Sequence, residues 1–361
     1  MISVKNIKFN NFRCFSSKTF VFDSEINILT GNNGCGKTSI VEGISYLCLG
    51  KSFRGAKDRD VLKLNSDYFN IISEIDDQNN IEKVVISYDG VNKRVKYGEI
   101  ICKTLSEYVG KYKLVSFSPD DLDVVKGSPA IRRRFIDLFI SQCDNNYLKV
   151  LVEYKKVLKM RNEFLKNINN QQYDKILFDV INENIIKYGK IIIDTRAKYI
   201  NLLNVYVKNI SKELSNNKEE VDIVYNPNVN INYYEKTLIN NINYDINTHT
   251  TNYGPHKDDY KIYISGNEGA IFGSQGQCRL AVLSIKLAMY EAFLKIDDNI
   301  IMVLDDVFSE LDIDRQKYLL TYIKKTGQVF ITTTDIDKLP KDLIDESNII
   351  EIGEGECNGW Y

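Results

Sequence analysis

The spacing of hydrophobic and polar positions changes along the chain. From residue 1 to about residue 115, apolar and polar residues mostly alternate, which predicts strands and turns. Residues 26–30 form a short apolar run that leads into a glycine-rich loop. Apolar residues then recur at helical spacing over 38–49 and stop at Gly50. This stretch therefore predicts a strand, a loop and a helix in succession.

The middle of the chain has helical spacing instead. Between about 130 and 216, apolar residues form two stripes separated by an Asn- and Gln-rich cluster at 167–172, which predicts an antiparallel helical hairpin inserted as a separate lobe. The stripes consist of Leu148, Leu151, Leu158 and Leu165, and of Ile181, Ile185, Tyr188, Ile192, Tyr199 and Leu203. Residues 216–250 are rich in Asn and Tyr with little period, so we expect loops, edge strands or partly mobile chain there.

The last hundred residues return to short strands alternating with helices. The apolar runs at 300–304 and 329–332 are typical of buried parallel strands. An α/β pattern thus stands at both ends of the chain. Two unrelated domains would explain this pattern, and so would one domain built from both ends.

Composition narrows the class of protein. A chain of 361 residues predicts two or three structural units, and a net charge of -2 argues against binding nucleic acid by bulk charge alone. Seven cysteines without a CxxC pair, and only two histidines, argue against a zinc site and favour a reducing compartment. No apolar run approaches the roughly 20 residues that span a bilayer. We therefore expect a cytoplasmic protein with no membrane partner.

The loop at 31–38 carries the strongest motif. Gly31-Asn32-Asn33-Gly34-Cys35-Gly36-Lys37-Thr38 matches G-x-x-x-x-G-K-[ST] between a predicted strand and a predicted helix. In such a loop the backbone N–H groups surround phosphate oxygens, Lys37 reaches the β- and γ-phosphates, and Thr38 coordinates Mg²⁺. The alternative is a glycine-rich turn that merely caps a helix.

A metal-binding carboxylate follows the apolar run at 300–304. Asp305 is the candidate metal ligand. Asp306, expected on the opposite side of an extended chain, is the candidate that orients or deprotonates the attacking water. Two carboxylates that only solvate a strand end are the alternative.

Two further segments allow a binding role or a purely structural one. Ser274, at the start of a long predicted helix, suits an anion such as a terminal phosphate, but Ser274 and Gln277 also form a capping-box pattern. Ser309 and Asp312 carry the same ambiguity at the next helix. The hydroxyls of residues 332–334 either reach a phosphate or simply end a strand.

Taken together, these motifs resemble the ABC-type ATPase heads of SMC-like proteins, and more closely the RecF family of bacterial DNA replication and repair proteins. The resemblance covers the chain from end to end except around 216–247. Its supporting strings, in family order, are NFR at 11–13, GKSFR at 50–54, FSPDDL at 117–122, KGSP at 126–129, RRRF at 132–135, residues 154–166, GPHKDD at 254–259, SQGQ at 274–277 and SELD at 309–312.

The resemblance implies an α/β fold: an ABC-type P-loop ATPase head with an inserted helical lobe. We expect residues 1–120 and 246–361 to form the head and 121–245 the lobe. It also implies an ATP-dependent homodimer that uses ATP and Mg²⁺, with each nucleotide held between two copies.

The implied residues fall into three groups. One copy supplies nucleotide contacts from Arg13, Gly31, Asn32, Asn33, Gly34, Cys35, Gly36, Lys37, Thr38 and Ser39. The other supplies Ser274, Gly276, Gln277 and the loop 309–312. Thr38 and Asp305 would hold the metal, and Lys37 and Asp306 would be catalytic.

Departures from ordinary ABC ATPases imply slow turnover. Asp306 stands where those enzymes have glutamate, and residues 332–334 stand where they have a histidine, so we expect a weak DNA-stimulated ATPase that works as a switch. No Q-loop glutamine is evident, and residues 117–122 are its candidate replacement. We interpret GPHKDD at 254–259 as a turn that braces the helix after Ser274.

Local charge supports contact with DNA. Residues 126–166 contain ten Lys and Arg and four Asp and Glu, a net of +6, which leaves the rest of the chain at -8. The candidate DNA-binding residues are Arg132, Arg133, Arg134, Lys155 and Lys156. A basic helix face that is only solvated is the alternative.

The resemblance implies a DNA repair and replication protein that dimerises with ATP on gapped or junction DNA and helps to load recombinase with RecO- and RecR-type partners. The second hypothesis is the nucleotide-binding subunit of an ABC transporter. The third is a nuclease-coupled SMC-like ATPase, although we find neither a long heptad arm nor an additional acidic cluster.

Overall fold

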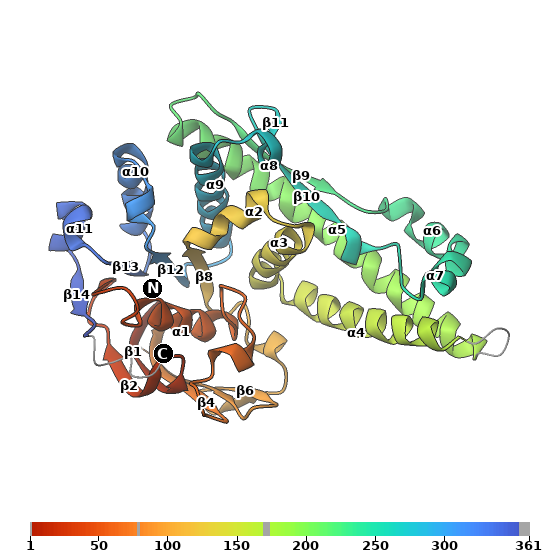
Figure 1. Ribbon diagram of the computed structural model, residues 1–361, viewed down its shortest axis with the longest axis horizontal. Coiled ribbons are helices and arrows are strands. Elements are labelled where there is room, and N and C mark those ends of the chain that lie inside the picture. The colour runs from red at the N-terminus through yellow and green to blue at the C-terminus, as the bar shows by residue number, and fades with distance from the viewer. Residues whose placement is uncertain (1, 78–79, 169–173, 354–361) are drawn as a thin grey trace. The chain divides into compact units, whose positions relative to one another are not determined.

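A computed structural model describes residues 2–77, 80–168 and 174–353. The chain divides into two compact units (Figure 1). The first comprises residues 1–121 and 283–361, and the second residues 122–282. Most of the predicted linker at 167–172 lies outside the described residues.

A five-stranded parallel sheet is built from both ends of the chain and confirms that they share one domain. Its strand order is β14-β3-β13-β12-β8. The strands are β3 (Ile26–Thr30), β8 (Lys113–Phe117), β12 (Ile300–Asp305), β13 (Gln328–Thr333) and β14 (Asn348–Glu351). All six residues of β12 and of β13 are buried, as the apolar runs predicted.

A six-stranded antiparallel sheet forms the other layer of the first unit, in the order β2-β1-β4-β5-β6-β7. The strands are β1 (Ile2–Phe12), β2 (Phe15–Val21), β4 (Phe69–Asp77), β5 (Asn80–Tyr88), β6 (Lys93–Tyr97) and β7 (Ile100–Cys102). Alternate residues of β4 are buried, which is why this region has a period of two in the sequence. The buried Gln328 amide bonds both backbone groups of Val4 and so joins the two sheets.

Helix α1 (Lys37–Leu49) packs against strands of both sheets. It ends at Gly50, whose left-handed backbone caps it as predicted. Two shorter helices, α10 (Ile313–Ile323) and α11 (Lys341–Asp345), follow β12 and β13. The long helix α9 (Gln275–Leu294) contains the boundary between the units.

The second unit is mainly helical. Its helices are α2 (Asp123–Lys126), α3 (Pro129–Cys143), α4 (Asn145–Asn167), α5 (Lys175–Leu214), α6 (Tyr234–Asn240), α7 (Ile242–Thr248) and α8 (Gly269–Phe272). A small antiparallel sheet contains β9 (Val221–Asn226), β10 (Asp259–Ile264) and β11 (Asn267–Glu268). Helices α4 and α5 form the predicted hairpin, with Phe164 stacked on Phe178 at 5.0 Å between ring centroids.

Residues 246–282 belong to this second unit, whereas the sequence placed them in the ATPase head. The physical reason is strand pairing, because β10 pairs with β9 along six residues and also packs on α3. The first boundary, after Asp121, lies one residue from the predicted one. Residues 216–250 contain the expected edge strand, but α6 and α7 were not predicted.

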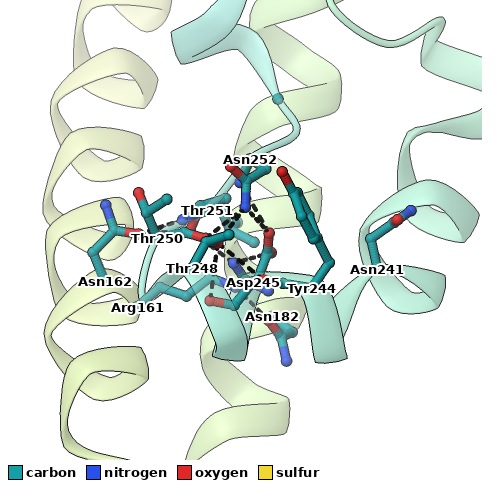
Figure 2. Close-up of polar contacts among 12 residues, drawn as sticks. Arg161, Asn162, Asn182, Asn241, Tyr244, Asp245, Thr248, Thr250, Thr251 and Asn252 are labelled. Atoms are coloured by element: carbon teal, nitrogen blue, oxygen red, sulfur yellow. Dashed lines mark hydrogen bonds and ion pairs between the residues drawn. The ribbon is translucent and has the colours of Figure 1, made fainter.

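A buried polar network fixes the hairpin to the segment that follows it (Figure 2). The fully buried Arg161 of α4 donates to Asn182 of α5 at 2.8 Å and to Asp245 of α7 at 2.7 Å. It also donates to Thr251 at 2.7 Å. A buried charge needs such partners, so Arg161 belongs to the core although the sequence counted it in a basic surface.

The segment 254–259 braces the helical hairpin, whereas the sequence predicted that it braces the helix after Ser274. Arg196 of α5 donates to the Pro255 carbonyl at 2.7 Å and to Asp258 at 2.8 Å. His256 lies between the Tyr154 hydroxyl, 2.7 Å from Nδ1, and the Thr251 carbonyl, 2.9 Å from Nε2. These contacts tie the segment to α4 and α5.

Candidate functional site

The loop between β3 and α1 has the backbone geometry of a phosphate-binding loop. Gly36, just before α1, has a left-handed backbone with φ of 105°. Gly31 has φ of 144°, and a Cβ there would lie 2.6 Å from the Ile352 carbonyl oxygen. Side chains are therefore excluded at the point where the loop turns into the helix N-terminus, whose N–H groups favour anions.

Lys37 lies at this loop. Its Nζ donates to the carbonyl oxygens of Gly31 at 2.6 Å and Asn32 at 2.8 Å. The side chain is buried, so the ammonium is held at the loop and not in bulk water. This is the position from which a lysine can meet the phosphates of a nucleotide.

The motif residues 38 and 305, from opposite ends of the chain, are in direct contact. Thr38 Oγ1 donates to Asp305 Oδ1 at 3.0 Å, and Thr332 Oγ1 donates to the same oxygen at 2.7 Å. Burial raises the pKa of Asp305 above its usual range, while the two hydroxyl donors partly offset that effect. Hydroxyl and carboxylate oxygens are hard ligands, so the pair fits Mg²⁺.

Asp306 differs from its predicted geometry. Strand β12 ends at Asp305, and Asp306 has a left-handed φ of 53°, so it does not continue an extended chain toward the opposite side. Its side chain instead lines the same cavity as Asp305. The Ser309 hydroxyl donates to the Asp306 carbonyl at 2.9 Å and holds the turn.

Arg13 also lies at this cavity, as the resemblance implied, but its guanidinium is already paired. It donates to both carboxylate oxygens of Glu42, at 2.6 and 2.7 Å. Glu42 is buried and also accepts from Ser52 at 2.5 Å. Glu42 and the cavity-lining Arg54 were not predicted as site residues, because neither stands in the loop motif.

These side chains surround one cavity of about 400 Å³ in the first unit. Its lining includes most of the residues predicted to bind nucleotide or metal in this part of the chain. The lining residues are Arg13, Cys14, Asn33, Gly34, Gly36, Lys37, Thr38, Ser39, Glu42, Arg54, Asp305, Asp306, Thr332 and Thr334.

The segment at 274–277 starts α9 and forms the predicted capping box. Gln277 N–H donates to Ser274 Oγ at 3.2 Å, and Ser274 N–H donates to Gln277 Oε1 at 2.9 Å. The cap uses a lone pair of the serine hydroxyl and leaves its proton able to donate elsewhere. A Cβ on Gly276 would meet no atom within 4 Å. The capping and binding roles are therefore compatible.

The second predicted capping box does not form. Asp312 alone caps α10, by accepting from Arg315 N–H at 2.9 Å. The Ser309 hydroxyl is directed back to Asp306 because Ser309 lies within a short 3-10 turn, Phe308–Glu310, that precedes the helix.

The five candidate DNA-binding residues are in different environments. Arg132 donates to both oxygens of Asp259, at 2.8 and 3.0 Å, and Arg133 donates to the Asp258 carbonyl at 2.6 Å. Arg134 is exposed on α3. Lys155 and Lys156 are exposed on α4, where Lys156 pairs with Glu153 at 2.6 Å.

Over residues 2–77, 80–168 and 174–353, no helix is long and apolar enough to cross a membrane. In that same part of the chain, no group of three or more His, Cys, Asp or Glu side chains is placed to hold a metal ion.

Comparisons with known proteins agree with this geometry. A family model described as an AAA domain matches residues 6–252. The chain is 36% identical to the DNA replication and repair protein RecF of Geobacillus thermodenitrificans over 97% of both chains. It is 32% identical to RecF of Staphylococcus aureus over 98% of this chain and 99% of that protein.

Solved structures show the same likeness. The recombination mediator protein RecF with ATP, from the RecFOR pathway, superposes with a TM-score of 0.89 at 31% identity, covering 98% of this chain and 96% of that one. An Smc head domain from Pyrococcus furiosus has a TM-score of 0.54 at 17% identity over 98% of this chain and 95% of that one. The second comparison supports the ATPase-head fold alone.

Proposed function

The chain belongs to the RecF family of DNA replication and repair proteins, and on that basis we propose that it is an ATP-switched DNA-binding repair protein. The observation that carries this proposal is the contact of Thr38 with Asp305 inside a cavity lined by the phosphate-binding loop. ATP and Mg²⁺ are its cofactors, and the cytoplasm is its compartment.

Four side chains of the cavity have distinct roles in this proposal. Thr38 and Asp305 hold Mg²⁺, whose charge offsets that of the phosphates. Lys37 contacts the terminal phosphates from the loop. Asp306, at the turn after β12, orients the water that attacks the γ-phosphate, and its short side chain suits slow turnover.

A second copy of the chain completes the site. We assign Ser274, Gly276 and Gln277 of the partner copy to the terminal phosphate, because the Ser274 hydroxyl and the first N–H groups of α9 are donors at a helix N-terminus. ATP therefore joins two copies, and hydrolysis separates them.

DNA contact runs along the exposed face of α4. Lys155, Lys159 and Lys166 recur there at helical spacing, and the exposed Lys149 and Lys156 complete a row of lysines along the helix. At 1.5 Å per residue the row extends about 25 Å, long enough to follow several phosphates. Arg132 and Arg133 contribute less, since each is bound within its own unit.

We further propose that the protein acts on gapped or junction DNA and helps to load recombinase with RecO- and RecR-type partners. The RecFOR setting of the solved relative supports this assignment. A transporter subunit is not proposed, because the relatives at 32 and 36% identity are DNA replication and repair proteins over nearly the whole chain.

The test is DNA binding with and without ATP, on gapped and blunt duplexes across a salt series. Replacing Lys155 and Lys156 by Glu should weaken binding and lower the log–log salt slope by about 2, since each lysine neutralises about one phosphate. The control variant has the same charge change at the exposed Lys83 and Lys103 of the first unit. Equal salt slopes for the two variants would refute the proposal that DNA binds along α4.

A further inference from the structure

One threonine bonds two consecutive acidic residues of the cavity, the carboxylate of Asp305 and the backbone N–H of Asp306. Thr332, at the end of β13, is 2% exposed. Its Oγ1 donates to Asp305 Oδ1 at 2.7 Å and accepts from Asp306 N–H at 3.0 Å. A hydroxyl has one proton and two lone pairs, so both bonds form at once.

The strand register makes this arrangement possible. Strands β12 and β13 are parallel, and Asp305 pairs with Thr332 in that ladder. The two side chains therefore leave adjacent strands at the same level. Asp306, the next residue, turns into the left-handed region, where its N–H points back to Thr332.

The two neighbouring threonines do not have these contacts. Thr333 Oγ1 donates to the Asp335 carbonyl at 2.9 Å and accepts from Asp335 N–H at 3.1 Å, so it holds the turn after β13. Thr334 lines the cavity. Among the described residues 332–334, Thr332 alone bonds Asp305 or Asp306.

We propose that Thr332 is a positioning residue that sets the metal-side carboxylate and the water-orienting Asp306 relative to each other. This inference rests on the function proposed above. Thr332 touches neither nucleotide nor water in this proposal. It acts by fixing Asp305 Oδ1 from one side while Thr38 binds it from the other, and by holding the turn that aims Asp306.

Two consequences follow for a variant without the hydroxyl. Thr332→Val keeps the branched shape but leaves Asp305 with Thr38 as its remaining hydroxyl donor and Asp306 N–H without its side-chain acceptor. Loss of a bond to a metal-binding carboxylate typically lowers metal affinity by 10- to 100-fold. Hydrolysis should fall as well, because Asp306 N–H keeps only the longer bond to the Thr332 backbone carbonyl, at 3.3 Å, and its side chain is aimed less firmly.

The experiment measures the dependence on Mg²⁺ and the dependence on ATP separately, in the 361-residue chain. The first readout is the Mg²⁺ concentration at which ATPγS binding is half-maximal, with binding measured by a filter assay. The second is kcat and KM for ATP. For Thr332→Val we expect an increase of about tenfold or more in the Mg²⁺ midpoint and a fall of about tenfold or more in kcat. KM for ATP at saturating Mg²⁺ should change less than about twofold, since Lys37 and the loop are intact.

Two controls separate positioning from general stability. Thr332→Ser restores the hydroxyl and should return both values to within about threefold of the parent protein. Thr333→Val removes a hydroxyl from the same strand end and should leave both readouts unchanged. Thr332→Ala removes the hydroxyl without placing a methyl group beside Asp305, and it replaces the valine variant if that one does not fold.

The inference is overturned if Thr332→Val and Thr332→Ala keep the parental Mg²⁺ midpoint and kcat, or if Thr333→Val shifts them equally. Binding of ATPγS by the parent protein tests the proposed function separately. If the parent protein binds no ATPγS at any Mg²⁺ concentration, both proposals fail together. If the parent binds normally and only the Thr332 result is negative, the proposed function stands.

Discussion

Acidification should weaken the second unit through His256. Burial lowers the pKa of His256 to about 4 from an ordinary value of 6.5, and the nearby Lys257, Arg133 and Arg161 act in the same direction. Its hydrogen bonds suit the neutral ring, with Nε2–H donating to Thr251 and Nδ1 accepting from Tyr154. A proton on Nδ1 would force the Tyr154 hydroxyl to turn away.

Proton linkage gives the sign and size of this effect on the free energy of unfolding. Because the folded pKa is the lower one, the unfolded chain binds the proton more readily, so the contribution is fully present above pH 6.5 and lost as the pH falls toward 4. Between pH 7 and pH 5 these two pKa values give a loss of about 2 kcal/mol in the free energy of unfolding.

Hydrogen exchange of core amides in α4 and α5 measures this quantity in the intact chain, where a single unfolding transition need not cover both units. The control is His256→Gln, which keeps an amide donor and an acceptor but does not titrate in this range. The parent protein should lose about 2 kcal/mol more than the variant between pH 7 and pH 5. An equal loss in both proteins would refute the assignment of the pH effect to His256.

Three substitutions test other parts of the structure. Lys37→Met should abolish ATP-dependent dimerisation, because it removes the ammonium that lies at the phosphate loop; unchanged dimerisation in sedimentation would contradict this role. Asp306→Asn should slow hydrolysis and prolong the ATP-bound dimer, and turnover equal to that of the parent would exclude Asp306 as the water-orienting group. Arg161→Met leaves Asp245 buried without its charge partner and should destabilise the second unit by about 3–5 kcal/mol, measured by hydrogen exchange in α4.

The phosphate-binding side of the site could be predicted from sequence because its signals are local. The loop at 31–38 and the run ending at Asp305 each have a fixed spacing that backbone geometry requires. The same holds for the buried strands β12 and β13, whose continuous apolar residues indicate two covered faces.

What the sequence did not reveal depends on contacts between distant residues. Glu42 is a helix residue with no motif of its own, and its role appears only when Arg13 is seen to bind both of its oxygens. A count of charges included Arg132 and Arg161 in a basic surface. In the structure Asp259 neutralises Arg132 and Asp245 neutralises Arg161, and each partner lies more than eighty residues away in the sequence. The boundary at 246 was wrong because the pairing of β9 with β10 crosses it.

The central claim is that ATP bound at the loop of one copy is completed by Ser274 of another. Sedimentation velocity of the full chain with ATP and Mg²⁺, for the parent protein and for Ser274→Arg, tests it most directly. We expect an ATP-dependent dimer for the parent, and for Ser274→Arg a monomer that still binds ATP. A Ser274→Arg protein that dimerises with ATP as the parent does would contradict the shared site.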